Sequence, residues 1–254
     1  MHRFFVPNAP KVGESFELPK SEAHHAVSVL RVRVGDTAIA LDGKGRALRC
    51  EVESCGRRQV SLRAGEETVR PRTGGELILV QAVAKGKAMD LIIQKATELG
   101  VARVVPVITE RTVARPDSGD YAAKRDKWRD IAIEACKQCG AVWLPEVDEP
   151  MTLGDALATC RPTGRLSLVT ALEEGAMEIR AGFEAFRGRE GREPDSVSIW
   201  VGPEGDFSEN EMIDIKAAGA IPVTLGELTL RSETAAICGL SIAGAELRTA
   251  AAPG

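Results

Sequence analysis

The fold class of this 254-residue chain is decided by one stretch, SVSIWVGPEGDFSENE, which runs from Ser196 to Glu211. Its first six residues, 196–201, are mostly apolar and predict a buried strand. Its last four, 208–211, form a capping-box pattern that predicts a helix start. Between them, two glycines flank the Pro203-Glu204 pair, so the backbone turns tightly and a ligand can approach it closely. A strand, a short loop and a helix in this order indicate an α/β domain with a ligand site at the strand end.

The same alternation extends from this stretch in both directions. Apolar runs predict strands at 76–84, 101–108, 166–171 and 221–225. Helical spacing predicts helices at 89–99, ended by Gly100, and at 120–138, 208–219 and 232–248. The charged, glycine-containing segment 181–195 is expected to be a surface excursion. Strands that alternate with helices predict a mostly parallel sheet.

The first 70 residues show shorter, β-rich segments. Strands are expected at 3–6, 36–41, 47–55 and 59–63, and Asp42-Gly43 is a hairpin signal between two of them. Ser21 is expected to cap a helix that runs through Leu30. Residues 70–75 have the composition of a linker. We therefore expect two domains, a small β-rich barrel-like domain at 1–72 and an α/β domain at 73–254.

Composition and charge limit the classes of protein and of partner that fit this sequence. The hydrophobic fraction of 44% and the charged fraction of 28% are typical of a globular protein. No apolar run is long enough to span a membrane and no export signal is visible, so we expect a cytoplasmic protein without a membrane partner. Residues 1–72 hold 13 basic and 9 acidic residues, while the remainder holds 20 and 28. The basic excess favours a polyanionic partner for the first domain, although chance is an equal alternative.

Several common sites are absent from the sequence. It has no P-loop, no dinucleotide-binding glycine fingerprint and no nucleophile elbow. Cys136 and Cys139 form a CxxC pattern, but they lie inside a helical pattern without a second cysteine pair, so we expect packed side chains and no metal site.

Three strand ends of the α/β domain are candidates for one ligand site: 169–174, 201–207 and 224–235. Taken singly, the loop at 201–207 favours a ligand site over an ordinary turn, because such turns rarely need Gly-Pro-Glu-Gly. Arg231 and Glu233 in the third loop, taken alone, read as surface charges around a helix cap. None of the loops is rich in anion-binding groups and the domain is acidic. A ligand that carries positive charge, such as S-adenosylmethionine, suits such a site better than one with several phosphates.

Together these segments resemble a known family, the ribosomal RNA small subunit methyltransferase E family of SPOUT-class RNA methyltransferases. The resemblance runs from about residue 3 to 248. It is carried by 25–31 (HAVSVLR), 85–86 (KG), 94–95 (QK), 98–101 (ELGV), 110–112 (ERT), 138–140 (QCG) with Pro145, 202–205 (GPEG) and 225–235 (LGELTLRSETA).

The resemblance implies a PUA-like first domain, a second domain with a deep trefoil knot, a homodimer, and methylation of uridine N3 in 16S rRNA. It places S-adenosylmethionine at Thr170, Leu172, Gly202, Pro203, Glu204, Gly205, Leu225, Gly226, Leu230 and Thr234. Beside that site, we expect Arg231 to stabilise negative charge on the uracil edge and Glu233 to orient the base or accept its proton. We expect RNA contacts from Arg3, His25, Arg31, Arg33, Lys85 and Lys95.

The sequence departs from the family pattern at a few positions. Asp206 stands where a glycine is usual, Leu228 where an arginine is usual and Lys137 where a glutamate is usual. Ala141 replaces a common arginine, and Lys87 carries the positive charge that the family has next to Met89. Two alternatives to the rRNA uridine methyltransferase stay open: a related enzyme that acts on tRNA or another rRNA base, and a non-catalytic RNA-binding or assembly factor.

Overall fold

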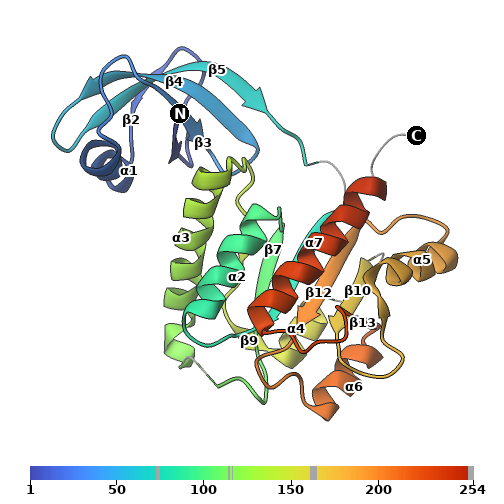
Figure 1. Cartoon of the computed structure of the whole chain (residues 1–254). Coiled ribbons are helices and arrows are strands. Elements are labelled where there is room, and N and C mark those ends of the chain that lie inside the picture. The colour runs from blue at the N-terminus through green and yellow to red at the C-terminus, as the bar shows by residue number, and fades with distance from the viewer. Residues whose placement is uncertain (73–74, 114, 116, 161–164, 251–254) are drawn as a thin grey trace. The chain divides into compact units, whose positions relative to one another are not determined.

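The computed structural model describes residues 1–72, 75–113, 115, 117–160 and 165–250, and they form two compact units (Figure 1). The first unit comprises Met1–Arg72 with Ile133–Leu144, and the second comprises Thr73–Ala132 with Pro145–Gly254. Thr73 and Gly74 of the expected linker lie outside the described residues. Residues 133–144 thus belong to the unit that precedes them in the chain.

The first unit is built on a five-stranded sheet with the order β1-β3-β4-β5-β2. Its strands are β1 (His2–Phe5), β2 (Ser15–Glu17), β3 (Thr37–Leu41), β4 (Arg46–Cys55) and β5 (Val60–Val69). The expected hairpin joins β3 and β4 as an antiparallel pair. At its turn, Asp42 Oδ1 accepts hydrogen bonds from the backbone N–H groups of Lys44 (2.6 Å) and Arg46 (3.0 Å). The carboxylate therefore fixes the turn that the Asp-Gly pair predicted.

The helical segment of the first unit begins differently from the prediction. Helix α1 (Lys20–His25) has Pro19 at its N-cap position and no side-chain cap, so the prediction that Ser21 caps the helix is wrong. The fixed φ of proline supplies an extended residue just before the helix. A π-helical turn, η1 (Ala26–Leu30), follows and ends at Arg31, whose φ of 54° is left-handed.

A buried ion pair lies in the first unit. The Lys137 ammonium contacts Glu22 at 3.0 Å and Glu134 at 2.8 Å, and the side chains of Lys137 and Glu22 are each 8% exposed. Burial raises the pKa of the Glu22 carboxyl, and the hydrogen bond from Lys137 opposes this rise. Lys137 thus faces a buried glutamate from α1 that needs a positive partner.

The second unit contains an eight-stranded sheet in which the assigned strand pairs are all parallel. Its order is β11-β13-β10-β12-β6-β7-β8, with β9 also paired to β7. The strands are β6 (Glu76–Ala82), β7 (Arg103–Ile108), β8 (Glu146–Val147), β9 (Met151–Thr152), β10 (Arg165–Thr170), β11 (Met177–Glu178), β12 (Ser196–Val201) and β13 (Ile221–Thr224). The expected parallel α/β sheet is therefore confirmed.

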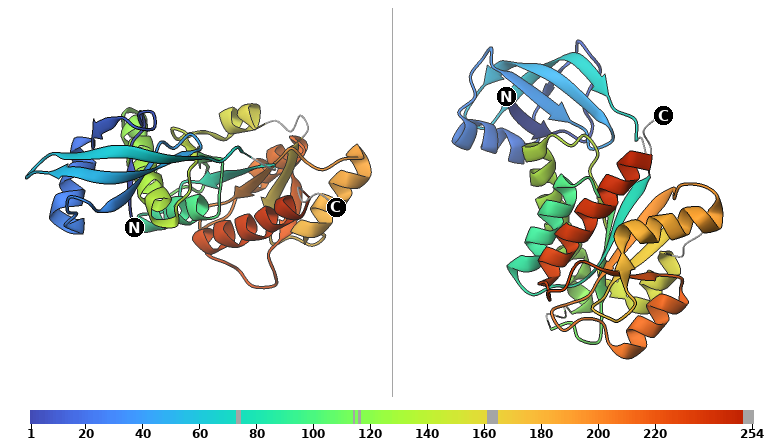
Figure 2. Two further views of the ribbon diagram at one scale, coloured as in Figure 1. Left: turned by 90° about the horizontal axis from the view of Figure 1, so that it is seen from above. Right: turned by 45° about the vertical axis from the view of Figure 1, so that its right-hand side comes forward.

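Helices cover both faces of this sheet. The helices that follow β6 in the chain are α2 (Lys87–Glu98), α3 (Tyr121–Cys139), α4 (Leu153–Thr159), α5 (Ile179–Glu190), α6 (Glu209–Ala217) and α7 (Ser232–Ala250), together with the short 3₁₀ helix η2 (Ser118–Asp120). Helices α2 and α7 lie side by side in front of β6 and β12 (Figure 2). On the opposite face, Ala156 of α4 and Ile215 of α6 pack against Ile78 and Trp200. Coverage of both faces explains why all six residues of β12 are buried.

The segment expected to be a surface excursion, 181–195, is instead mostly helix α5, so that prediction is wrong. Ile179, Phe183 and Phe186 are buried along one side of this helix. Their spacing of four and three residues is the helical signal, which the surrounding charges obscured. Residue 208 behaves as predicted, since Ser208 and Glu211 form the complete capping box of α6.

Candidate functional site

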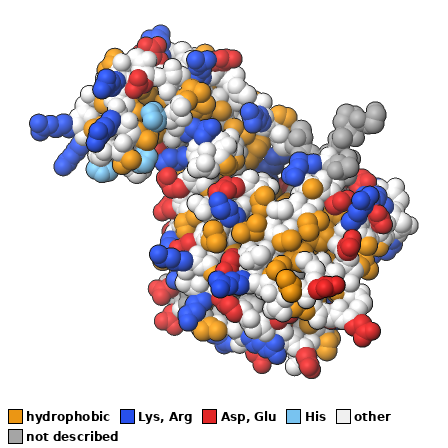
Figure 3. Space-filling view, in the orientation of Figure 1, with side chains coloured by type: hydrophobic (Ala, Val, Ile, Leu, Met, Phe, Trp, Pro, Cys, Tyr) orange, Lys and Arg blue, Asp and Glu red, His pale blue; other side chains and the backbone are white. Residues whose placement is uncertain are grey.

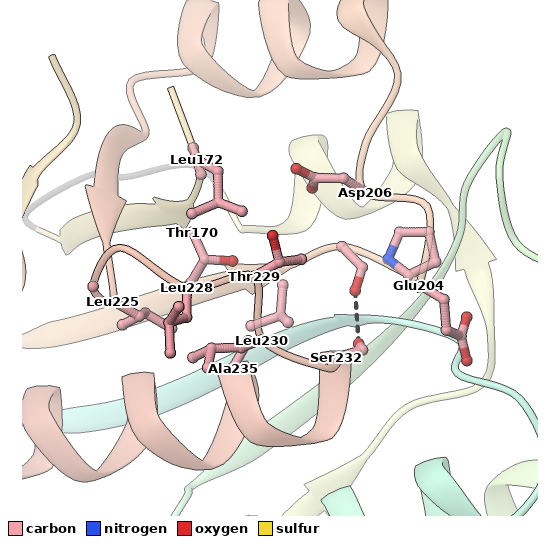
Figure 4. A pocket seen from close by; sticks show the side chains of 15 residues that line it. Thr170, Leu172, Glu204, Asp206, Leu225, Leu228, Thr229, Leu230, Ser232 and Ala235 are labelled. Atoms are coloured by element: carbon pink, nitrogen blue, oxygen red, sulfur yellow. Dashed lines mark hydrogen bonds between the residues drawn. The ribbon is translucent and has the colours of Figure 1, made fainter. Parts of the chain in front are cut away.

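A cavity lies where the chain leaves three neighbouring strands of the second unit. The loops after β10, β12 and β13 and the first turn of α7 surround it (Figure 4). Its lining residues are Thr170, Ala171, Leu172, Val201, Gly202, Pro203, Glu204, Asp206, Leu225, Gly226, Leu228, Thr229, Leu230, Ser232 and Ala235. Because the strands are parallel, their carboxyl ends share one edge of the sheet, and segments 65 residues apart in the chain converge there.

The loop after β12 is shaped by close contacts of its own. Asp206 has a left-handed φ of 61°, and its Oδ1 accepts a hydrogen bond from the backbone N–H of Phe207 at 2.8 Å. A Cβ atom at Gly202 would stand 2.6 Å from that Oδ1. Asp206 thus adopts the conformation that its usual glycine would reach without strain. Its side chain also makes the glycine at position 202 a steric requirement.

A buried hydrogen-bond relay joins three elements beneath the cavity. Gln81 Nε2 of β6 donates to Ser232 Oγ at 2.9 Å. Ser232 Oγ in turn donates to the Gly202 carbonyl at 2.7 Å, the bond drawn in Figure 4. Gln81 is fully buried and Ser232 is 5% exposed. Since buried hydrogen bonds are costly to lose, this relay holds the start of α7 against the loop after β12.

Two further contacts hold the same loop from outside. The Arg111 guanidinium donates to the carbonyls of Gly205 (2.7 Å) and Phe207 (3.3 Å). The backbone N–H of Lys85 donates to Glu204 Oε1 at 3.0 Å. The loop is thereby tied to the chain segments that follow β7 and β6.

The lining of the cavity divides into two chemical parts. Leucines 172, 225 and 228 gather on one side, and the carboxylates of Glu204 and Asp206 lie on the other (Figure 4). Leu172 is 58% exposed and Leu228 is 78% exposed, so apolar surface stands open to solvent at the rim. The lining that the structure describes contains no lysine or arginine. The site suits a ligand with a flat apolar part and a positive charge.

Most of the residues predicted to bind the cofactor line the cavity. They are Thr170, Leu172, Gly202, Pro203, Glu204, Leu225, Gly226 and Leu230. Gly205 and Thr234 are not among the lining residues. The prediction omitted Ala171, Val201, Asp206, Leu228, Thr229, Ser232 and Ala235. Most of these neighbour a predicted residue in the chain, and Ser232 was recognised only as a helix cap.

The two predicted catalytic residues lie at the edge of the cavity rather than in its lining. Arg231 is exposed and directly precedes α7, and Glu233 is half-buried in the first turn of that helix. Both flank Ser232, whose hydroxyl reaches the loop after β12. Both residues are therefore at least partly accessible to solvent next to a residue that lines the cavity.

The predicted RNA-binding residues are distributed over both units. In the first unit, His25 ends α1, Arg31 and Arg33 are exposed, and Arg3 donates to the carbonyls of Lys137 (3.0 Å) and Gln138 (2.9 Å). Arg3 thus binds carbonyls in the last turn of α3. In the second unit, Lys85 is exposed at the sheet edge that holds the cavity.

Within the second unit, the predicted RNA-binding residue Lys95 does not line the cavity. It binds Glu98 in the last turn of α2 with both distances at 2.9 Å. Eight residues of helix separate it from Lys87, which corresponds to about 12 Å along the helix axis.

The described residues lack two kinds of feature. Within them, no group of three or more histidine, cysteine or acidic side chains is arranged to hold a metal ion. No helix in the described part of the chain is both long and apolar enough to cross a bilayer.

Comparison with known proteins identifies relatives over nearly the full length. Residues 71–244 match the family model for an RNA methyltransferase domain, and residues 18–64 match that for an RNA methyltransferase PUA domain. The ribosomal RNA small subunit methyltransferase E of Bacillus subtilis is 29% identical and covers 95% of both chains. That of Aquifex aeolicus is 30% identical over 95% of this chain and 98% of its own.

Solved structures of methyltransferases are also similar to this chain over nearly its full length. A methyltransferase of Legionella pneumophila in complex with the cofactor SAM is 31% identical, with a TM-score of 0.86 over 96% of this chain and 97% of the other. A ribosomal RNA small subunit methyltransferase E of Neisseria gonorrhoeae bound to S-adenosyl methionine is 30% identical, with a TM-score of 0.83 over 98% and 97%.

Proposed function

Because this chain belongs to the RNA methyltransferase domain family, we propose that it transfers a methyl group from S-adenosylmethionine to 16S rRNA of the small ribosomal subunit. The single observation that carries the proposal is the cavity at the ends of β10, β12 and β13, with leucines on one side and carboxylates on the other. Relatives of about 30% identity, two of them solved with this cofactor bound, support it. The N3 atom of a uridine is the proposed methyl acceptor.

The residues of the cavity fit S-adenosylmethionine. Leu172, Leu225 and Leu228 offer apolar surface for an adenine ring, and exposed backbone at Gly226 permits close approach. Glu204 and Asp206 supply negative charge near a sulfonium and an ammonium group. When bound, the cofactor supplies an electrophilic methyl group with a neutral thioether as leaving group. The chain itself has to align the acceptor atom with that methyl group.

Arg231 and Glu233 are the proposed catalytic residues. Uridine N3 loses a proton when it is methylated, so negative charge develops on the uracil edge. The guanidinium of Arg231 stabilises that charge, and Glu233 orients the base or accepts the proton. Both residues stand beside Ser232, which contacts the cofactor loop. Wild-type single-turnover methylation by Arg231→Ala would refute this assignment.

The first unit is proposed to bind the RNA. Met1–Arg72, the proposed first domain, has a basic excess, and part of it matches a PUA domain of RNA methyltransferases. Exposed Arg31 and Arg33, with His25, are proposed to contact phosphates. Such contacts make RNA affinity fall steeply with salt. An RNA affinity that does not change with salt would contradict this role.

Three finer features complete the proposal: a SPOUT-type trefoil knot in the proposed second domain, 73–254, a homodimer, and a cytoplasmic location beside the ribosomal substrate. Exposed apolar side chains on the adjacent helices α2 and α7 support the dimer, since Leu91 is 39% exposed and Ile242 is 38% exposed. Hydrophobic side chains spread across this part of the surface (Figure 3). Sedimentation of a monomer at micromolar concentration would contradict the dimer.

The deciding experiment is nucleoside mapping by mass spectrometry. Small-subunit rRNA is compared between cells that contain the protein and cells that lack it, and loss of one N3-methyluridine is the expected result. Purified protein is then given S-adenosylmethionine with either naked 16S rRNA or assembled 30S particles, which identifies the substrate form. An unchanged rRNA together with cofactor binding would favour another RNA as substrate. The absence of any cofactor binding would favour a non-catalytic RNA-binding factor.

A further inference from the structure

A second cavity lies in the same unit, beside the first turn of α2 and the N-terminal half of α3. Its volume is about 380 Å³, and three lysines, Lys87, Lys124 and Lys127, contribute to its lining. The remaining lining residues are Val83, Ala84, Gly86, Met89, Asp90 and Trp128. We call this site the lysine cleft. With three ammonium groups and one carboxylate, its lining carries a net positive charge although the unit as a whole is acidic.

The positive groups of the lysine cleft are available to a ligand. Lys87 and Lys124 are exposed, and neither has an ion-pair partner among the residues that the structure describes. Lys127 contacts the carboxylate of Asp90 at 2.7 Å, and its side chain is 55% exposed. The acid in the cleft is therefore already neutralised by one lysine, which leaves two ammonium groups for an anion.

The backbone at the start of α2 adds to this arrangement. Gly86 occupies the N-cap position with a φ of 58° and no side-chain cap. The space that a Cβ atom would take at Gly86 is open within 4 Å. Backbone N–H groups and the positive end of a twelve-residue helix thus face a gap that a ligand can enter.

The floor of the lysine cleft is apolar. Met89 is 1% exposed and Trp128 is 3% exposed, and Val83 and Ala84 are buried beside them. An anion with an apolar neighbour suits this combination better than a bare inorganic ion. A nucleotide unit of a nucleic acid has that chemistry, since its phosphate is charged and its base and sugar carry apolar faces.

The lysine cleft opens at the same sheet edge as the cofactor cavity. Strands β6 and β12 are neighbours, with Gln81 in register with Val201. After β6 the chain runs through Val83 and Ala84 into the cleft, and after β12 it runs into the cofactor loop. The two loops touch, since the Lys85 N–H donates to Glu204 Oε1 at 3.0 Å.

We propose that the lysine cleft binds a backbone phosphate of the RNA strand that carries the target base. This inference rests on the proposed function, because it concerns how the second unit holds that RNA. Lys87 and Lys124 contact the phosphate. Lys127 stays paired with Asp90 beside them. Such a contact fixes the register of the strand beside the methyl donor without reading its sequence.

The test compares charge-removing variants by RNA binding. Lys87→Gln/Lys124→Gln is measured against Arg180→Gln/Arg189→Gln, which removes the same charge from exposed positions of α5. The probe is an unmodified 16S rRNA transcript, titrated from about 50 to 200 mM salt. For the lysine variant we expect about tenfold weaker binding and a salt slope reduced by about 0.7 to 0.9, from the loss of one neutralised phosphate. Binding equal to that of the α5 variant would overturn the proposal.

A second variant is expected to raise RNA affinity, so a loss of affinity caused by poor folding cannot be mistaken for the expected result. Asp90→Asn removes the carboxylate and releases Lys127, so RNA affinity should rise and the salt slope should steepen. A merely structural role of the cleft would not raise affinity, and an Asp90→Asn variant that binds more weakly than wild type would count against the proposal. Titration with S-adenosylmethionine distinguishes a failure of the proposed function from a failure of the lysine cleft to bind RNA. Failure of the wild-type protein to bind that cofactor contradicts the proposed function, whereas normal methylation with no lysine effect contradicts only the cleft.

Discussion

Replacement of Ser232 by alanine tests the relay that joins the cofactor loop to β6 and α7. The hydroxyl accepts from Gln81 at 2.9 Å and donates to the Gly202 carbonyl at 2.7 Å, and these groups are buried. In Ser232→Ala, Gln81 keeps its bond to the Ala82 carbonyl, so the main cost is one unsatisfied buried carbonyl. That cost is about 1–3 kcal/mol in free energy of unfolding. A loss of about 2 kcal/mol corresponds to roughly 4–8 °C in Tm for a domain of this size.

The assay combines denaturant unfolding with calorimetric titration of S-adenosylmethionine. Because Gly202 lines the cavity, we expect the freed loop to weaken cofactor binding as well, by about tenfold if roughly 1.4 kcal/mol of the cost falls on the bound state. Ser241→Ala is the matched control, since Ser241 lies on the same helix and its hydroxyl bonds only to the Ile237 carbonyl at 2.7 Å. If both variants unfold and bind alike, the reasoning about the relay is wrong.

Three further substitutions have expected outcomes. Lys137→Met leaves Glu22 buried without its partner, so it should lower the free energy of unfolding by about 3 kcal/mol or more. Burial raises the folded-state pKa of the Glu22 carboxyl. The contribution of this group to the free energy of unfolding is therefore complete below its ordinary pKa of 4.5 and is lost as pH rises. The deficit of Lys137→Met, followed by urea unfolding, should therefore grow above pH 4.5, and a deficit that shrinks there would contradict the assignment. Arg111→Met removes two bonds to loop carbonyls from an exposed side chain, so KM for the cofactor should rise severalfold while Tm changes little; an unchanged KM would argue against the contact. Gly202→Ala brings a methyl group against Asp206 and should lower cofactor affinity at least about tenfold, with partial recovery in Gly202→Ala/Asp206→Gly, and no loss in calorimetry would show that the loop yields freely.

Local patterns predicted the elements around the cavity well. The apolar run at 196–201 is β12 residue for residue, and the Ser208 capping box forms as expected. These features depend on neighbours within four residues, which a sequence displays directly. The parallel sheet follows from the alternation of such elements, and it brings most of the predicted cofactor residues to one edge.

Contacts between distant residues were not predictable in the same way. Gln81 lies 151 residues before Ser232, and Arg111 lies 94 residues before Gly205. Gln81 is the one polar residue in the apolar run 77–84, but the local pattern does not show which distant residue it binds. The inclusion of residues 133–144 in the first unit and the pairing of Lys137 with Glu22 likewise arise only from tertiary packing.

The Gln81–Ser232 relay has a consequence for biosynthesis. Its two ends are separated by most of the second unit, so a growing polypeptide cannot close it until nearly the whole chain has left the ribosome. Closing so long a separation is entropically costly and slows folding. The methyl donor can therefore bind only after the chain has been synthesised beyond Ala235, and from then on it protects the folded unit against unfolding by mass action.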